Sequence, residues 1–193
     1  CDVIRWMAFD EDSRLARKVQ KGDRQAFEVL LARYERPIFS FTCHFFQDRA
    51  LSEDLTQETF LRAYRFIGSF RPREKFSSWL FSIAKNLCID ELRRRQKGTT
   101  VDIDAVDPDA LVSDSHVGNN PLVASVMVQQ GEILRKAIAR LPEKYRTSII
   151  LFYFNELSYE EISEVMQVSL SNTKILLFRG KKMLLDLYRE ETG

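Results

Sequence analysis

Residues 157–162 read Leu-Ser-Tyr-Glu-Glu-Ile, and they predict the start of a helix more strongly than any other part of the chain. Ser158 and Glu161 have the spacing of a capping box, in which each side chain binds the backbone N–H of the other residue. Leu157 and Ile162 occupy the two positions of a hydrophobic staple around it. A helix is therefore expected to begin at Ser158.

A second helix is expected after a tight turn. The first helix should end near Met166, residues 167–169 should form the turn, and helical spacing then continues through Lys174, Leu177 and Lys181. Two short helices joined in this way, the second ending in basic residues, are the outline of a helix-turn-helix. Any other helical hairpin with a basic end would show the same outline.

Apolar residues elsewhere in the chain also recur at helical spacing, which predicts an all-α fold. Strand-like alternation is confined to residues 101–104, which are few and acidic. Near the N-terminus, Gly22 and Asp23 should end one short helix and cap the next. Pro37 should kink or divide that second helix.

Two more helices are expected before residue 98. Ser52 is the predicted N-cap of the third helix and Gly68 its end. The predicted buried stripe of the third helix consists of Phe60, Ala63, Tyr64 and Ile67. The fourth helix should end near Gly98, and the residues predicted to face inward on it are Leu80, Ile83, Ala84 and Leu87.

Charge and composition divide the chain into parts. Residues 71–97 hold eight Lys or Arg and three acidic residues, whereas residues 98–134 hold no Lys or Arg. The predicted parts are an N-terminal tail (1–12), a first helical domain (13–98), a flexible acidic linker (99–120) and a second helical domain that contains the helix-turn-helix (121–193). The basic segments fit contact with a polyanion such as DNA, and a solvated helix face is the alternative.

Several functional classes find little support in the sequence. No apolar run is long enough to span a membrane, and residues 1–12 carry charges where a signal peptide would be apolar, so a soluble cytoplasmic protein is expected. The spacing of Cys1, Cys43 and Cys88 fits neither a disulfide framework nor a metal knuckle, and His44 is expected to be structural. No motif of an enzyme, cofactor site or metal site is present, so no catalytic residue is expected.

Four blocks, in order, resemble the extracytoplasmic-function (ECF) group of bacterial RNA polymerase sigma factors. Residues 19–27 (VQKGDRQAF) resemble its opening block, and residues 53–64 (EDLTQETFLRAY) its segment that binds the clamp helices of the largest polymerase subunit. Residues 76–86 (FSSWLFSIAKN) look like its promoter-melting helix. Residues 141–146 (LPEKYR), followed by 157–162, resemble its domain that reads the −35 element.

The resemblance implies a sigma factor that is not an enzyme. Such a subunit binds the clamp helices and flap of core RNA polymerase, reads the −10 and −35 promoter elements, helps to melt the promoter, and is commonly controlled by an anti-sigma factor. The implied polymerase-binding residues are Glu53, Asp54, Gln57, Glu58 and Arg62. The implied −10 and melting residues are Arg71, Arg73, Lys75, Phe76, Trp79, Lys85, Asn86, Asp90, Arg93 and Arg94. The implied −35 residues are Ser171, Asn172, Lys174, Ile175, Phe178, Arg179, Lys181 and Lys182.

Physical chemistry fits these assignments. Asp54, Gln57 and Glu58 should share an exposed face that offers hydrogen-bond acceptors, although an ordinary solvated acidic face has the same pattern. Aromatic rings near the start of the fourth helix can stack on unpaired bases. They are Phe76, Trp79 and Phe81, and at least one of them is expected to belong to the core.

The helix-turn-helix departs from the family pattern. Gln167 stands where the family usually has Gly, and residues 173–180 are unusually apolar, which suggests a promoter element read by shape or by thymine methyl groups, or a surface covered by a partner. Ser169 or Ser171 should cap the second helix, and Gly180 within it suggests close packing.

Two rival functions account for less of the sequence. A helix-turn-helix regulator that is not a polymerase subunit explains residues 158–182, but it leaves residues 53–64 and the aromatic cluster at 76–81 without a role. A nuclease would need a metal-binding or nucleophilic motif, and none is present.

Overall fold

The computed structural model describes residues 2–71, 74–98 and 121–192, and these residues are helical apart from turns and short connections. The predicted all-α fold is therefore confirmed. The helices are α1 (Asp2–Gln20), α2 (Arg24–Phe46), α3 (Arg49–Phe66), α4 (Phe76–Gly98), α5 (Pro121–Arg140), α6 (Glu143–Ile149), α7 (Tyr159–Met166) and α8 (Leu170–Thr192). A short 3-10 helix, η1 (Ile67–Ser69), follows α3, and a π-helix, η3 (Ile150–Phe154), follows α6.

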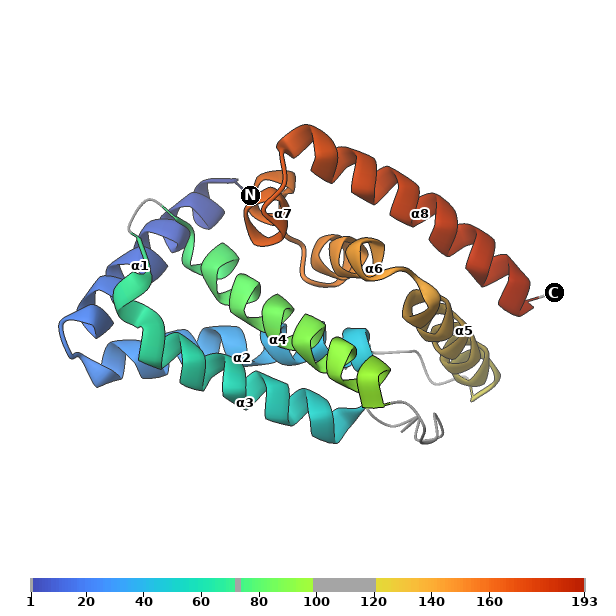
Figure 1. Ribbon diagram of the computed structural model, residues 1–193, viewed down its shortest axis with the longest axis horizontal. Coiled ribbons are helices and arrows are strands. Elements are labelled where there is room, and N and C mark those ends of the chain that lie inside the picture. Colours follow the sequence, from blue (N-terminus) through green and yellow to red (C-terminus); the bar gives the residue numbers. More distant parts are fainter. Residues whose placement is uncertain (1, 72–73, 99–120, 193) are drawn as a thin grey trace.

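The helices form two halves that lie against each other (Figure 1). Helices α1–α4 make the N-terminal half and α5–α8 the C-terminal half. Helix α4 packs against α7, and α2 packs against η3 and α5, so both halves contribute to one cluster of buried apolar side chains. The predicted linker, residues 99–120, lies outside the described residues.

Helix α1 packs against α2 and α4. It begins at Asp2, so the segment predicted as an N-terminal tail (residues 1–12) is helical from that residue. Asp12 is 5% exposed, and it accepts a hydrogen bond of 2.6 Å from the Tyr34 hydroxyl and pairs with Arg33. Burial raises the pKa of Asp12, against the opposing influence of these two partners. The contact ties α1 to α2.

Local signals at the start of α2 act as predicted. Gly22 has a φ of +95°, a conformation that glycine adopts without steric cost, and it follows the end of α1. The carboxylate of Asp23 then accepts a hydrogen bond of 3.1 Å from the backbone N–H of Ala26. The predicted stop and N-cap are both confirmed.

Helix α2 continues through Pro37, so of the two predicted outcomes, a kink or a division, the division does not occur. Helix α3 differs from expectation in two places. Asp48 caps α3 by accepting from the Leu51 N–H at 3.0 Å, whereas Ser52 lies within the helix and is buried, so the Ser52 cap was wrong. Tyr64 is 44% exposed and does not join the buried stripe, because it lies beside α2 at the edge of the core.

The turn chemistry of the C-terminal half agrees with the sequence. Both hydrogen bonds of the capping box form: Glu161 accepts from the Ser158 N–H at 2.9 Å, and the Ser158 hydroxyl accepts from the Glu161 N–H at 3.2 Å. The chain reverses at Gln167, whose φ is +56°. Of the two predicted caps for α8, Ser169 accepts from the Asn172 N–H at 3.2 Å.

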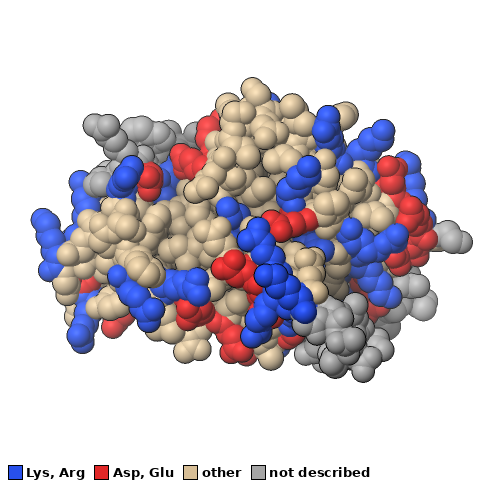
Figure 2. Space-filling view, viewed as in Figure 1, with Lys and Arg blue, Asp and Glu red and all other residues tan. Residues whose placement is uncertain are grey.

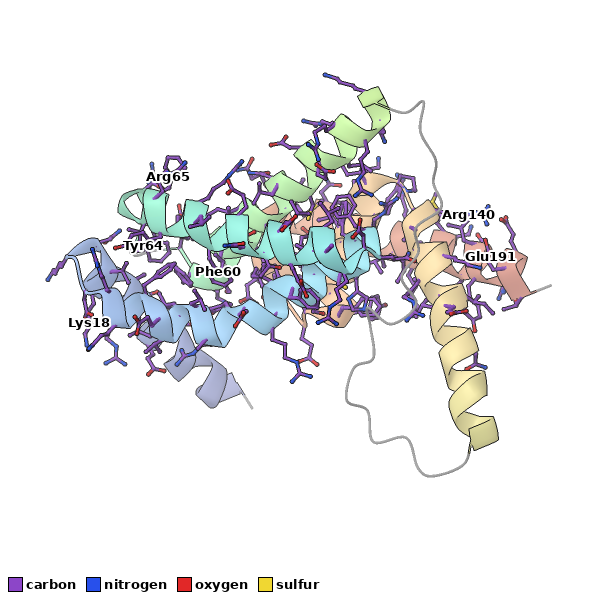
Figure 3. All side chains as sticks on the ribbon, turned by 90° about the horizontal axis from the view of Figure 1, so that it is seen from below. Lys18, Phe60, Tyr64, Arg65, Arg140 and Glu191 are labelled. Carbon is purple, nitrogen blue, oxygen red and sulfur yellow. The ribbon has the colours of Figure 1, made fainter. Side chains whose placement is uncertain are left out.

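The long helix α8 packs tightly on α6. A Cβ atom on Gly180 would lie 3.1 Å from Cγ1 of Ile149 and 3.4 Å from Cβ of Tyr145, which confirms the close packing expected at this glycine. At the other end of α8, Glu191 accepts a hydrogen bond of 2.9 Å from Arg140 of α5, and both residues are labelled in Figure 3.

The cysteine and histidine side chains of α2 and α4 are packed inside. Cys43 and Cys88 form no disulfide and have no exposed surface, and burial raises the pKa of both thiols. The ring centroids of His44 and Phe154 lie 3.9 Å apart, and burial lowers the pKa of His44. Within the described parts of the chain no cluster of His, Cys, Asp and Glu suits a metal ion, and no helix is long and apolar enough to cross a membrane.

Candidate polymerase and nucleic-acid interfaces

A row of polar side chains runs along the outer face of α3. Glu53, Asp54 and Gln57 are exposed, and Glu53 accepts a hydrogen bond of 3.0 Å from Arg49. The other two residues predicted for this face are partly exposed and pair with each other, because Arg62 donates to Glu58 at 2.7 Å. The structure thus places all five predicted polymerase-binding residues on one accessible helix.

A groove of about 1050 Å³ lies between this row and α2. Its apolar lining comes from Phe27 and Leu31 of α2 and from Phe60, Leu61 and Tyr64 of α3. Figure 3 shows Phe60 and Tyr64 between the two helices. Leu61 is 54% exposed, so the groove opens to solvent.

Sequence reasoning missed this groove because its residues have two roles. Phe27, Leu31 and Tyr64 follow the helical spacing of core positions, and periodicity alone assigns them to the interior. In the structure the rings of Phe27 and Tyr64 are 4.9 Å apart at the outer edge of the α2–α3 contact. Leu61 interrupts the predicted polar face of α3, and this apolar residue is the signal from which the surface could have been predicted.

The aromatic cluster at the start of α4 is mostly core. Phe76 and Phe81 are 1% and 2% exposed, which agrees with the expectation that at least one of the three rings is buried. Phe76 packs against Tyr34 and Phe70 at 5.5 and 5.7 Å, so in this structure its ring is not accessible for the predicted contact with a base. Trp79 is half-buried beside them.

The C-terminal part of α4 offers an accessible basic surface. Asn86, Asp90, Arg93 and Arg94 are exposed, as predicted from their spacing, and Arg94 pairs with Glu91 at 2.8 Å. Figure 2 shows basic side chains gathered over this end of the helix.

The N-terminal part of α4 and the loop before it differ from expectation. Arg71 is exposed, and Arg73 lies outside the described residues. Lys85 is only 9% exposed and donates to the backbone oxygen of Val165 in α7, so its predicted contact with a phosphate is closed in this structure. Lys75 pairs with Glu161 of α7 at 3.4 Å.

Helix α8 presents every residue predicted to face the −35 element. The exposed residues are Ser171, Asn172, Lys174, Ile175, Phe178, Arg179, Lys181 and Lys182. Phe178 is 74% and Ile175 47% exposed, one turn apart on a surface that is otherwise polar. The opposite face of the helix is buried through Thr173, Leu176 and Leu177. The predicted −10 and −35 residues thus fall on two helices in different halves.

Comparison with known proteins assigns both halves to one kind of protein. Residues 30–98, which include most of α2 and all of α3 and α4, match the family model of Sigma-70 region 2. Residues 131–184 match that of Sigma-70, region 4.

Solved structures share the fold. One is CnrH in complex with the cytosolic domain of CnrY, with a TM-score of 0.70 and 21% identity over 93% of this chain and 98% of that chain. Another is the sigma factor RpoE in complex with the anti-sigma factor NepR from Bartonella quintana, with a TM-score of 0.66 and 23% identity over 84% and 96% of the two chains.

Curated relatives are similar over most of their length. The ECF RNA polymerase sigma factor SigW of Bacillus subtilis is 34% identical over 171 residues, which span 87% of this chain and 91% of SigW. The RNA polymerase sigma-H factor of Pseudomonas aeruginosa is 32% identical over 178 residues, or 91% and 92% of the two chains. The four sequence blocks, the helical fold and these likenesses agree, and the chain belongs to the ECF family of RNA polymerase sigma factors.

Proposed function

We propose that this sigma factor binds core RNA polymerase through the groove between α2 and α3, reads the −10 element with α4, and reads the −35 element with α8. The observation that carries the proposal is the polar row of α3 beside an open apolar groove. Apolar side chains at the centre of an interface supply most of the binding energy, and a polar rim sets orientation and partner choice.

The division of labour follows the two halves of the chain. Residues 13–98, extended by the first residues of α1, would form the domain that binds polymerase and melts the promoter. Residues 121–193 would form the domain that recruits the complex to the −35 element. Residues 99–120 would join them and let each domain reach its own DNA site. We infer that the chain works in the cytoplasm, where polymerase and the chromosome are found.

A charge-reversal variant tests the polymerase contact. In the Asp54→Lys, Glu58→Lys double variant, two acceptors on α3 become cations, so assembly with core polymerase should weaken by at least tenfold while the helix content is kept. The matched control is Glu160→Lys, Glu164→Lys, which makes the same change in net charge on exposed positions of α7. Binding of labelled protein to core polymerase, with transcription from genomic DNA, measures the effect. Unchanged affinity of the α3 variant would contradict the assignment.

An anti-sigma factor is a further proposed partner. The fold of this chain is like that of RpoE from Bartonella quintana, which was solved in complex with the anti-sigma factor NepR. A regulator that covers the α2–α3 groove would prevent holoenzyme assembly. Such a regulator should therefore compete with core polymerase for the wild-type chain and should lose affinity in the α3 variant.

A further inference from the structure

Four cations at one end of the N-terminal half have no role in the function proposed above. All four are exposed, and within the described part of the chain none of them forms an ion pair. They are Lys18 in the last turn of α1, Lys21 in the turn that follows, Arg24 at the start of α2 and Arg65 in the last turn of α3. These four residues are named the basic end.

The fold brings the ends of α1 and α3 together. Gln20 is the last residue of α1, and its side-chain amide donates to the backbone oxygens of Ile67 at 2.8 Å and Phe70 at 2.9 Å. These two hydrogen bonds hold the end of α1 against η1, which directly follows α3. Figure 3 shows Lys18 and Arg65 at the same end of the molecule, and Figure 2 shows basic side chains around it. Cations that are far apart in the sequence therefore share one surface.

Helix stability accounts for only part of this charge. The helix dipole favours a cation in the last turn of a helix, where Lys18 and Arg65 lie. Arg24 is the first residue of α2, where the same dipole disfavours a cation. The carboxylate of Asp23 is engaged as the N-cap of α2, and Lys21 lies outside both helices. Like charges held on one surface also repel each other, so the basic end costs the free chain stability, as functional surfaces often do.

An exposed aromatic ring lies beside the basic end. Phe66 is the last residue of α3 and is 53% exposed. It stands between Arg65 and Ile67, the residue that Gln20 binds. Sites for single-stranded nucleic acid combine such groups, because cations hold the phosphates and an aromatic ring stacks on an unpaired base. In a duplex the faces of the bases are covered by their neighbours, so the ring favours a single strand.

The basic end also lies next to the loop assigned to promoter melting. Phe70, which Gln20 binds, is followed by the exposed Arg71, a predicted melting residue. The exposed Arg93 and Arg94 lie near the other end of α4, a helix of 23 residues and roughly 35 Å. In the proposed function, the promoter is paired upstream of the −10 element and single-stranded downstream of it. A strand that leaves the loop on the side away from Arg93 meets the basic end next.

We propose that the basic end and Phe66 bind the non-template strand of the melted promoter just downstream of the −10 element. The inference rests on the function proposed above for α4 and the loop before it, and it adds a further DNA contact to them. Lys18, Lys21 and Arg65 hold phosphates, and the ring of Phe66 stacks on a base. Phosphates and base faces are common to all nucleotides, so this contact holds the open strand whatever its sequence.

Fork-shaped promoter DNA tests the proposal with the intact holoenzyme. Two DNAs share the paired upstream part and a single-stranded −10 element, and in one of them the non-template strand continues a few nucleotides further. The Lys18→Gln, Lys21→Gln variant should bind the short DNA as the wild type does and the long DNA about five- to tenfold more weakly. Its salt dependence on the long DNA should be shallower by about 1.4 units of slope, because each phosphate contact on a single strand contributes about 0.7.

The matched control removes the same charge elsewhere. Lys136→Gln, Lys144→Gln replaces two exposed lysines of α5 and α6, and it should change the affinity for neither DNA. An equal loss of affinity for the short and the long DNA in the Lys18, Lys21 variant would mean a general attraction, and it would overturn the proposal. Weaker assembly of that variant with core polymerase, with normal binding of both DNAs once assembled, would assign the basic end to a protein partner and would also overturn it.

Stacking by Phe66 has a signature of its own. Phe66→Ala should lower the affinity for the long DNA about three- to tenfold and leave the salt dependence unchanged, because no charge is lost. When the nucleotides beyond the −10 element lack their bases, the wild type should lose affinity by a larger factor than the variant does. Equal factors for the two proteins would show that the ring binds no base.

Failure of the function proposed for α4 gives a different result, because the wild-type holoenzyme would then not bind even the short DNA. The free, full-length chain decides the proposal in that case, since its basic end is exposed. The Lys18→Gln, Lys21→Gln variant should bind a fluorescent single-stranded DNA pool about threefold more weakly than the Lys136→Gln, Lys144→Gln control. Equal affinities of these two variants would contradict a nucleic-acid contact at the basic end.

Discussion

Helices α4 and α8 are both 23 residues long and both carry predicted DNA contacts, yet they differ in what they leave accessible. Helix α4 lies among α2, α3 and α7, and its aromatic start and Lys85 are buried. Helix α8 packs with one face on α5, α6 and α7, and its predicted contacts are all exposed. Basic and aromatic composition therefore indicates a DNA-binding segment, but the way its neighbours pack around it decides which of its residues can reach DNA.

Two phenylalanine substitutions should show this difference most strongly. Phe76→Ala removes a ring that is 1% exposed, and such changes lower the free energy of unfolding by about 3–5 kcal/mol. Phe178→Ala removes a ring that is 74% exposed, so the free energy of unfolding should change by less than about 0.5 kcal/mol. Urea unfolding followed by circular dichroism measures both. Similar values for the two variants would mean that α4 and α8 are packed alike.

Two glycine substitutions sharpen the comparison for the C-terminal half. Gly180→Val adds a side chain whose Cβ atom would lie 3.1 Å from Ile149. Overpacking of this kind lowers the free energy of unfolding by about 1–3 kcal/mol. Gly131→Ala in α5 meets only Arg135, at 3.9 Å, and should stabilise the helix by about 0.5–1 kcal/mol. The sign of the change in thermal midpoint distinguishes them, and a stabilising Gly180→Val would refute the close contact.

Variants of α4 and α8 should also have different effects in promoter assays. Lys174→Ala with Arg179→Ala should lower recruitment about tenfold and reduce the salt dependence by roughly one unit of slope per lost phosphate contact. Melting of the bound fraction should be spared. Trp79→Ala with Arg73→Ala should leave closed complexes intact and lower the permanganate reactivity of thymines near the start site. Equal loss of recruitment in both pairs, with normal melting, would show the division to be wrong.

The smallest effects are expected at two glutamines in the left-handed conformation. Gln167, at the turn before α8, has a φ of +56°, and Gln167→Gly should raise stability by roughly 0.5–1 kcal/mol because glycine adopts this conformation freely. Gln47, at the end of α2, has a φ of +58°, but its amide donates to Arg135. Gln47→Gly should therefore raise the stability by less than Gln167→Gly does, or not at all. Thermal melts of both variants are the measurement, and an equal gain would mean that the Gln47 contact contributes no stability.

The predicted helix caps are confirmed where the groups that form them lie close together in the sequence. The capping box at Ser158 and the cap at Asp23 depend on groups within three residues, and each forms as expected. Ser52 failed as a cap because Asp48 has the same chemistry four residues earlier and begins the helix first. In each case the competing groups are visible in the sequence.

The burial of two residues predicted to contact DNA from α4 depends on groups far away in sequence. Lys85 is a typical surface residue by type, and it is buried because Val165, 80 residues further on, offers a backbone oxygen. Phe76 is buried against Tyr34, which belongs to α2. Helical spacing shows which side of a helix is apolar, but it does not show which neighbour covers the polar side.

The π-helix at Ile150–Phe154 sets the orientation of the helices that follow it. Its last turn is closed by the Asn155 N–H, which donates to the Ile150 oxygen at 3.2 Å across five residues instead of four. Each residue of a helix is rotated by about 100° about the helix axis relative to the one before it. The extra residue in the wider turn therefore sets the direction in which Asn155 points toward Pro37. A one-residue deletion here would leave every helix able to form, and it would turn α7 away from α4. The orientation of the C-terminal half thus depends on the length of a single helical turn.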